Sequence, residues 1–297
     1  RANISIPIYN IQVGRMSVPI SITYNSSGVK VADMPSNVGS NWSLNAGGVV
    51  TKTVQGLDDF TVPKEIITIG SGSGYKSAGW LIGLLGYSLS IDQQNDPIPD
   101  IYHVNAPGLS TKFIHERLIN NIAKPIEIEN NGNLIEHSIG EVYRGSVTFD
   151  GGSTFVSLPA YGFTNMKITG LNGVQYSFGT TEISTTFRTN VTLKDIADAF
   201  SFRPNASKLD SMFDPETNQT INFIYEEYSN TFYDTFHPQP YNYNWSMNIQ
   251  SNRLTQISFD KGSVEFIYGL ERIDNTGEKA LTEVLVKNHL GTVIKHM

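Results

Sequence analysis

Six histidines are the side chains in this sequence that could most readily hold a metal ion or move a proton near neutral pH. The sequence has no cysteine, so thiolate nucleophiles, thiolate zinc sites and disulfides are excluded. A zinc site without cysteine depends on histidines that are closely spaced on one element, and no such pair occurs. The sequence therefore predicts structural or surface histidines, with no metal site and no cofactor. These histidines are His103, His115, His137, His237, His289 and His296.

Serine and carboxylate chemistry also lacks a supporting pattern. A serine hydrolase holds its nucleophile in a Gly-x-Ser-x-Gly elbow between a strand and a helix, and the nearest segment, GSGSGY at 70–75, does not fit that pattern. No Lys-Ser/Thr pair follows it, so it is not a phosphate-binding loop either. Carboxylates that are adjacent in sequence, at 58–59 and 226–227, would point to opposite faces of a strand. We therefore expect no enzyme, and a hydrolase has no positive support.

The strongest candidate for binding is the aromatic segment YEEYSNTFYDTFHPQPYNYNW at 225–245. Two prolines at alternate positions, Pro238 and Pro240, do not fit a central strand, so an ordered loop or an edge excursion is predicted. Its aromatic rings could stack on sugar rings, while neighbouring asparagines bond to hydroxyls. The alternative is that the rings cover the open end of a sheet. The candidate glycan-binding residues are Tyr233, Tyr241, Tyr243 and Trp245.

Alternation of apolar and polar residues indicates that strands position these side chains. In VPISITYN, the side chains of Val18, Ile20 and Ile22 share one face, while serine and threonine occupy the other. Gly14 separates this run from a similar one before it, which predicts a hairpin. Helical periodicity is rare. Residues 190–200 are the best helix candidate, and the segment LSTKFIHERLINNIAK is ambiguous between strand and helix.

Four segments in the second half repeat one pattern, in which a polar turn joins two alternating strands. They span residues 166–179, 208–227, 253–269 and 280–297. Three have glycine in or beside the turn, and the second has Pro215 and Asn218 instead. Gly262 is expected to supply the positive φ that a tight hairpin requires. The array predicts an all-β fold with few short helices, in which successive hairpins build antiparallel sheets as a sandwich or an open β-shell.

Composition fits a β-rich extracellular or cell-surface protein. Only 16% of the 297 residues are charged, and the net charge of −7 without a cluster of Lys and Arg argues against nucleic-acid binding. The most apolar segment, 78–91, is interrupted by glycine and is shorter than the ~20 apolar residues that span a bilayer. A buried strand or a short packed helix is expected there. We expect one continuous unit with two lobes, residues 1–140 and 141–297.

The opening of the chain carries a specific series of motifs. A strand with Ser-Ile-Pro-Ile, a glycine turn and a strand Pro-Ile-Ser-Ile-Thr-Tyr-Asn precede Gly-x-x-Trp-Ser-Leu-x-x-Gly-Gly and a β-branched strand. Residues 1–56 thereby resemble the N-terminal module of Rhs/YD-repeat proteins, most closely the Bacteroidetes type, and more distantly the start of Tc-toxin B-component and SpvB-like proteins. The segment PDIYHVNAPGLSTKF and the hairpin ending in VEFIYG resemble this group more loosely. The chain departs from it at Tyr233–Asp234, because the Tyr-Asp-x-x-Gly repeat motif needs a glycine that is not present here.

This resemblance implies a non-catalytic structural scaffold at the N-terminal side of a large secreted or cell-surface bacterial protein. In this polymorphic-toxin-like family, β-repeats form a shell that can enclose a toxin or effector, so the implied partner is the downstream β-shell repeats of the same polypeptide. No catalytic residue is carried over. The alternative function is a glycan-binding module that uses residues 225–245, with a glycan or a surface molecule as partner. Neither a nucleic-acid partner nor a membrane span is expected.

The tryptophan motif has a physical explanation that needs no ligand. Trp42 is large enough to fill the corner of a sheet. Gly39 before it, and Gly47 and Gly48 after it, would let the backbone turn sharply beside the ring. The strand from Val49 would then leave in a new direction. The sequence predicts that Trp42 is buried and that Gly47 or Gly48 has a positive φ.

Overall fold

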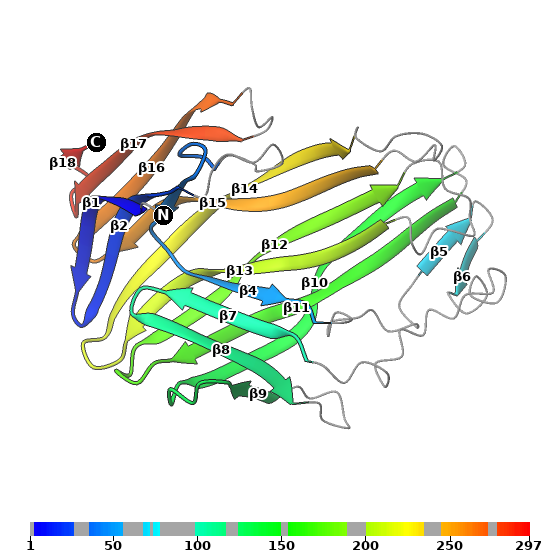
Figure 1. Ribbon diagram of the computed structural model, residues 1–297, viewed down its shortest axis with the longest axis horizontal. Coiled ribbons are helices and arrows are strands. Elements are labelled where there is room, and N and C mark those ends of the chain that lie inside the picture. The colour runs from blue at the N-terminus through cyan, green and yellow to red at the C-terminus, as the bar shows by residue number, and fades with distance from the viewer. Residues whose placement is uncertain are drawn as a thin grey trace.

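The computed structural model of the chain consists of β-strands and their connections across its described residues (Figure 1). It describes residues 3–26, 36–55, 68–71, 74–77, 99–116, 124–149, 154–188, 200–234, 245–272 and 278–297. The strands are β1 (Asn3–Val13), β2 (Met16–Asn25), β3 (Trp42–Asn45), β4 (Val49–Thr53), β5 (Thr68–Ser71), β6 (Gly74–Ser77), β7 (Ile101–Ala106), β8 (Leu109–Glu116), β9 (Lys124–Glu127), β10 (Leu134–Phe149), β11 (Thr154–Thr169), β12 (Gln175–Arg188), β13 (Phe200–Asp214), β14 (Gln219–Asp234), β15 (Trp245–Phe259), β16 (Gly262–Glu271), β17 (Lys279–Asn288) and β18 (Val293–His296). The predicted all-β fold is confirmed.

The alternating runs of the sequence form strands because one face of each strand can be buried. Along β2, Met16, Val18 and Ile20 are buried, and the residues between them are more exposed. β7 repeats the pattern with Tyr102 and Val104. The common core that these faces form is rich in Ile, Val, Phe and Tyr. These β-branched and aromatic side chains fit a pleated, half-buried surface.

All four hairpins that the sequence predicts in the second half are present. Their turns join β11 to β12, β13 to β14, β15 to β16, and β17 to β18. Each turn contains one residue with positive φ: Gly173 at 79°, Asn218 at 54°, Gly262 at 153° and Gly291 at 78°. Asn218 replaces glycine in the second hairpin because asparagine tolerates this conformation better than most residues with a side chain. The predicted hairpin at Gly14, with φ of 56°, is also present.

Fifteen of the described strands form one sheet that splits along its length. At one end, β11, β12, β13, β14, β15 and β16 pair in chain order. β13 has β12 on one side, and its partner on the other side changes along its length. Near the end of β13 this partner is β14, where Ser211 pairs with Asn222; nearer its middle the partner is β4, where Ala206 pairs with Thr51. In this region β15 pairs with the edge of β12 that faces away from β13. β4, β7, β8 and β9 extend the sheet beyond the split (Figure 1).

The double glycine carries the chain from a small sheet into the large one. β1, β2 and β3 form a three-stranded sheet, while β4, which begins at Val49, belongs to the large sheet. The predicted change of direction is therefore confirmed. Neither Gly47 nor Gly48 has positive φ, so that part of the prediction is wrong. Gly48 is needed for close packing instead, because a Cβ there would lie 2.7 Å from the Cβ of Ala106 on β7.

Trp42 is half-buried, so the prediction of a buried indole is wrong. The positive φ values lie before it instead, at Gly39 (118°) and Asn41 (62°). Its ring packs against Tyr24, its neighbour across the β2–β3 ladder, with ring centroids 5.2 Å apart. Ser36 donates a hydrogen bond to the Trp42 carbonyl at 2.6 Å. Because β3 is the edge strand of the small sheet, the indole covers that edge and does not fill a corner.

A carboxylate at the end of β13 ties the small sheet to the large one. Asp214 is fully buried, and Arg15, from the β1–β2 turn, places its Nε 3.2 Å from both oxygens of the carboxylate. The Thr217 hydroxyl and the Glu216 amide donate to the same carboxylate at 2.9 and 3.1 Å. The Arg15 hydrogen bonds, ahead of the other donors, hold the pKa of Asp214 well below its usual range. The two sheets therefore meet through an ionised carboxylate.

The aromatic segment at 225–245 begins and ends in strands, and the prediction of a loop is wrong for those residues. β14 runs to Asp234, and β15 begins at Trp245, which pairs directly with Asp234. Pro238 and Pro240, which argued against a strand, lie outside the described residues. A proline removes one donor from the ladder at its own position. The two prolines therefore did not prevent the flanking residues from forming the strands β14 and β15.

Four other expectations fall on different parts of the chain. The helix candidate at 190–200 lies outside the described residues, except that Phe200 is the first residue of β13. The apolar segment at 78–91 also lies outside them. The segment that was ambiguous between strand and helix begins as β8. The expected lobe boundary at residue 140 falls within β10, which pairs with β11 on both sides of that position.

Gly262 offers a direct test of the hairpin geometry. A Cβ at this position would lie 2.0 Å from the backbone oxygen of Lys287 on β17, so Gly262→Ala should cost about 2–4 kcal/mol of unfolding free energy. The matched control is Gly291→Ala. Its φ is 78°, but nothing lies within 4 Å of the added Cβ, so a backbone penalty of about 1–2 kcal/mol is expected. Urea melts measure both losses, and equal losses would contradict this packing.

Candidate functional site

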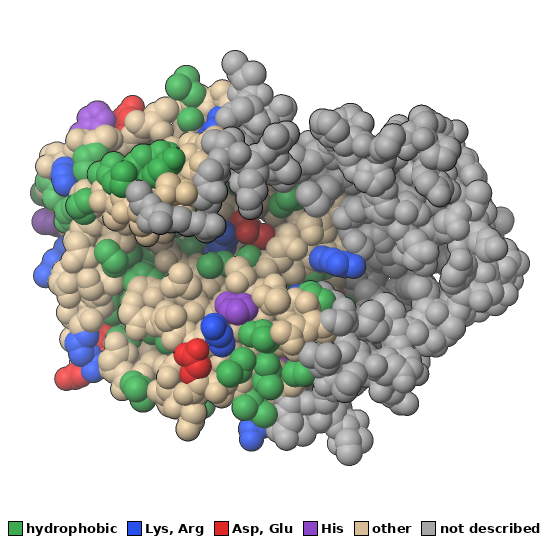
Figure 2. Space-filling view, in the orientation of Figure 1, with side chains coloured by type: hydrophobic (Ala, Val, Ile, Leu, Met, Phe, Trp, Pro, Cys, Tyr) green, Lys and Arg blue, Asp and Glu red, His purple; other side chains and the backbone are tan. Residues whose placement is uncertain are grey.

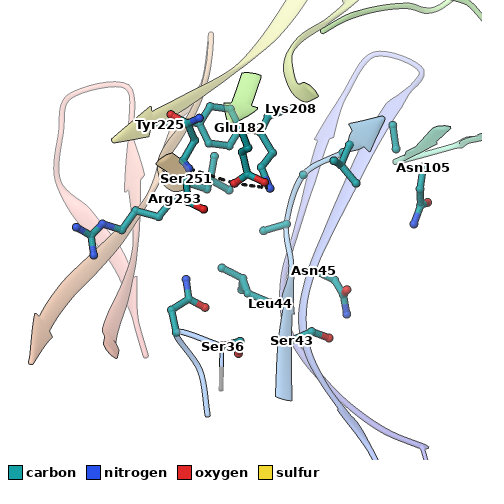
Figure 3. A pocket seen from close by; sticks show the side chains of 18 of the residues that line it. Ser36, Ser43, Leu44, Asn45, Asn105, Glu182, Lys208, Tyr225, Ser251 and Arg253 are labelled. Carbon is teal, nitrogen blue, oxygen red and sulfur yellow. Dashed lines mark hydrogen bonds and ion pairs between the residues drawn. The ribbon is translucent and has the colours of Figure 1, made fainter. Parts of the chain in front are cut away.

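A cleft of about 830 Å³ opens where the large sheet splits (Figure 3). Residues of β4, β7, β12 and β13 line one part of it, and residues of β14, β15 and β16 line another. β3 and the segment before it also contribute to the walls. We call it the polar cleft and define it by Glu182, Lys208, Tyr228, Asn252, Arg253 and Glu278. Its volume lies within the range of about 300–1,000 Å³ that is usual for ligand pockets. It is therefore the leading candidate for a site in the described part of the chain.

One ion pair of the polar cleft joins β12 to β13. Glu182 and Lys208 lie 3.2 Å apart, with side chains 18% and 23% exposed. The Glu182 carboxylate also accepts a hydrogen bond from the backbone amide of Asn252 on β15 at 3.1 Å. The Asn252 side chain donates to the carbonyl of Thr181 at 3.1 Å. Side chains thus connect three strands at the point where the backbone ladder changes partners.

Arg253 is a buried guanidinium with partners on several sides. Its side chain is 5% exposed and forms ion pairs with Glu226 at 3.0 Å and with Glu278 at 3.5 Å. Its guanidinium carbon lies 4.7 Å from the centre of the Tyr228 ring and 5.3 Å from that of Tyr268. These distances are typical of cation–π contacts. Such partners are necessary because a buried charge loses its hydration.

Three tyrosines hold the walls of the polar cleft. The Tyr225 hydroxyl donates to the carbonyl of Leu209 at 2.8 Å, and the Tyr268 hydroxyl donates to the carbonyl of Leu254 at 2.8 Å. Burial raises the pKa of Tyr225, Tyr228 and Tyr268 well above its usual value. All three phenols are therefore neutral at physiological pH, and two of them are fixed by backbone acceptors.

The charges that line the polar cleft cancel. Its lining contains the carboxylates of Glu182 and Glu278 and the cations of Lys208 and Arg253, so the formal charges sum to zero. The described lining residues include no histidine, cysteine or aspartate. Donors and acceptors are therefore present together without a net formal charge. This arrangement can bind a polar molecule through hydrogen bonds.

The aromatic residues that the sequence singled out for glycan binding lie at or beyond the limits of the described residues. Tyr241 and Tyr243 lie outside the described residues. Tyr233 is in β14 and Trp245 is in β15, where they pair with Ser246 and Asp234 of the opposite strand. The aromatic platform therefore stays a prediction. Of the tryptophan motif, the double glycine at 47–48 lines the polar cleft.

Sequence reasoning missed the residues that meet in the polar cleft. It considered Glu226 and Glu227 only as a candidate catalytic pair, and the structure gives them different partners: Glu226 pairs with Arg253, and Glu227 accepts a hydrogen bond from Gln250. One signal was available, namely Arg253 at the start of an alternating strand segment. A charge at a core-facing position of a strand requires a buried partner, although the pattern does not reveal which residue it is.

Two histidines that are 22 positions apart in sequence meet in the core. The Nε2 atoms of His115 on β8 and His137 on β10 are 2.9 Å apart, which requires one ring to donate and the other to accept. The rings of Tyr102, Phe113 and Phe163 pack around the pair. Burial, ahead of the neighbouring His137, lowers the pKa of His115 to about 3, and burial also lowers the pKa of His137. Both rings are therefore neutral at pH 7.

Neither a metal site in the described residues nor a known relative points to a function for this chain. In the described ranges, no three metal-ligating side chains come together, and no helix there is long and apolar enough to cross a membrane. Comparison with protein-family models, curated proteins and solved structures found no match. The role of the polar cleft therefore rests on its own chemistry.

Removal of the buried guanidinium tests the structural role of the charges. Arg253→Met leaves Glu278, also 5% exposed, without its cation, so the protein should lose about 3–5 kcal/mol of unfolding free energy. The double variant with Glu278→Gln should recover part of this loss. Arg144→Met is the control, because the Arg144–Glu141 pair is exposed by 40% and 36% and should contribute less than about 1 kcal/mol. Equal losses for both arginines in urea melts would contradict the buried network.

The histidine pair predicts a specific loss of stability in acid. The folded pKa of His115 is about 3, below the unfolded value of about 6.5, so the unfolded chain binds the proton more readily. Stability therefore falls as pH drops below about 6.5, by about 2 kcal/mol between pH 7 and pH 5 for this one residue. His115→Phe should reduce that pH dependence, whereas His289→Phe at an exposed turn should not. Parallel pH profiles for wild type and His115→Phe would refute the assignment.

Proposed function

We propose that this chain is a non-catalytic structural module, a segment of an open β-shell in a large secreted or cell-surface protein of the Rhs/YD-repeat type. The observation that carries the proposal is that one sheet grows by hairpins in chain order. From β13 to β18, every strand pairs with the next one along the chain. A sheet of this kind is extended by one more hairpin without rearrangement of the strands already in place.

The last strand of the series supports this proposal because it has an open edge. Among the described strands, β18 pairs with β17 alone. Its residues are exposed, and they include the large apolar side chains of Val293 and Ile294, at 45% and 60%. An exposed apolar edge accepts a further strand, because pairing satisfies the backbone groups and covers the side chains. The partner proposed for this edge is the downstream β-repeats of the same polypeptide.

The use of charged residues also supports a structural role. Arg15 and Asp214 connect the two sheets, and Lys287 and Glu265 connect β17 to β16 at 2.6 Å. Each of these charged side chains forms an ion pair with another side chain of the same chain. Figure 2 shows basic and acidic side chains interspersed over the described part of one face, which is not the pattern of a nucleic-acid-binding surface.

Hydrogen exchange at β18 tests the proposal. In the 297-residue chain, amides on the open edge of β18 should exchange at least ~10-fold faster than those of β17, which is paired on both sides. In a longer product of the same open reading frame, these amides should become protected because the next strand pairs with them. β17 is the internal control. Unchanged fast exchange at β18, or a reading frame that encodes no further hairpins, would count against the proposal.

A further inference from the structure

We propose that the polar cleft is a binding site for a neutral oligosaccharide. This inference does not depend on the shell role, because it concerns the split within the sheet and not the β18 edge. It rests on the cleft lining, which includes Tyr225 and Tyr228 from the start of the aromatic segment at 225–245, and not on the four aromatic residues that the sequence singled out there. The size of the cleft, about 830 Å³, is the first condition that a small ligand requires.

Charge balance determines the class of ligand. Two carboxylates and two cations line the cleft, and the two ion pairs, Glu182–Lys208 and Arg253–Glu278, already neutralise them. A charged ligand would have to compete with one of these pairs and would leave the other member of the pair buried and uncompensated. A neutral ligand with hydroxyl groups avoids this cost. It can donate to the carboxylate oxygens and accept from ammonium and amide groups at the same time.

The arrangement of these groups matches the two-sided chemistry of a sugar ring. Figure 3 shows Glu182 and Lys208 at one side of the gap, with Leu44 of β3 across from them. The lining also includes the apolar side chains of Ile249 and Leu254 on β15. Sugars present hydroxyls around the ring and apolar C–H groups on its faces, so they require polar and apolar contacts together. The cleft supplies both kinds of contact.

The walls are organised before any ligand arrives. Tyr225 and Tyr268 are fixed by hydrogen bonds to backbone carbonyls, and Arg253 is held by its two carboxylate partners and its two tyrosine rings. Gly47 and Gly48 line the cleft without side chains that would fill it. Preorganised groups lose little conformational entropy on binding, so even a few hydrogen bonds contribute to affinity.

Saturation-transfer NMR with neutral trisaccharides tests the proposal. The probes are maltotriose, cellotriose and triacetylchitotriose, followed by an array of neutral glycans, all with the 297-residue chain. We expect transfer to at least one neutral glycan. Ser251→Phe, which fills the cleft from β15, should weaken its affinity by at least ~10-fold. The double variant Glu182→Gln/Lys208→Gln keeps the net charge and should weaken the same binding.

The control variant is Asn222→Phe, which adds the same ring at an exposed position of β14 outside the lining. It should bind as wild type does, and circular dichroism melts confirm that each variant is folded. Three results would overturn the proposal: no transfer to any neutral glycan, full affinity in folded Ser251→Phe, or stronger binding of an acidic oligosaccharide than of its neutral counterpart. None of these results changes the expected hydrogen exchange at β18, so the two proposals fail independently.

Discussion

Backbone pairing is the constraint on which the rest of this structure depends. Each buried amide and carbonyl in a sheet requires a hydrogen-bond partner, and the long hairpins diverge before they end. Where β14 leaves β13, the freed edge of β13 is paired by β4. β4 reaches that position because the chain crosses from the small sheet through Gly47 and Gly48. The absence of a side chain on Gly48 lets the backbone approach Ala106 closely enough for β4 and β7 to pair.

The polar cleft follows from the same divergence. Where β14 and β15 separate from β13, β15 pairs with β12 instead, and side chains make the contacts across the opening between them. Glu182 contacts both Lys208 and the Asn252 amide, and Arg253 contacts two carboxylates and two tyrosine rings. At the split, side chains with low exposure thus find their partners in other side chains.

The two proposed roles use different properties of one sheet. The proposed structural role depends on the open edge of β18, whereas the proposed binding role depends on the polar cleft between the strands. The histidine pair shows a third consequence of the same architecture. It brings β8 together with β10 in the core. The part of the sheet formed by β4, β7 and β8 therefore contacts the long hairpins in two ways: through the backbone pairing of β4 with β13 and through this side-chain contact.

The sequence by itself determined the features that depend on a few neighbouring residues. Alternation predicted strands, and turn residues such as Gly262 and Asn218 predicted hairpins, because a positive φ is decided within a single turn. The tertiary structure decided which distant strands became neighbours. The partnership of β4 with β13, the half-buried position of Trp42, and the meeting of Arg253 with Glu278 could not be read from local patterns. The physical reason is that alternation specifies which face of a strand is buried, whereas the partner that covers that face, or completes its ladder, is chosen by the packing and hydrogen bonding of the whole chain.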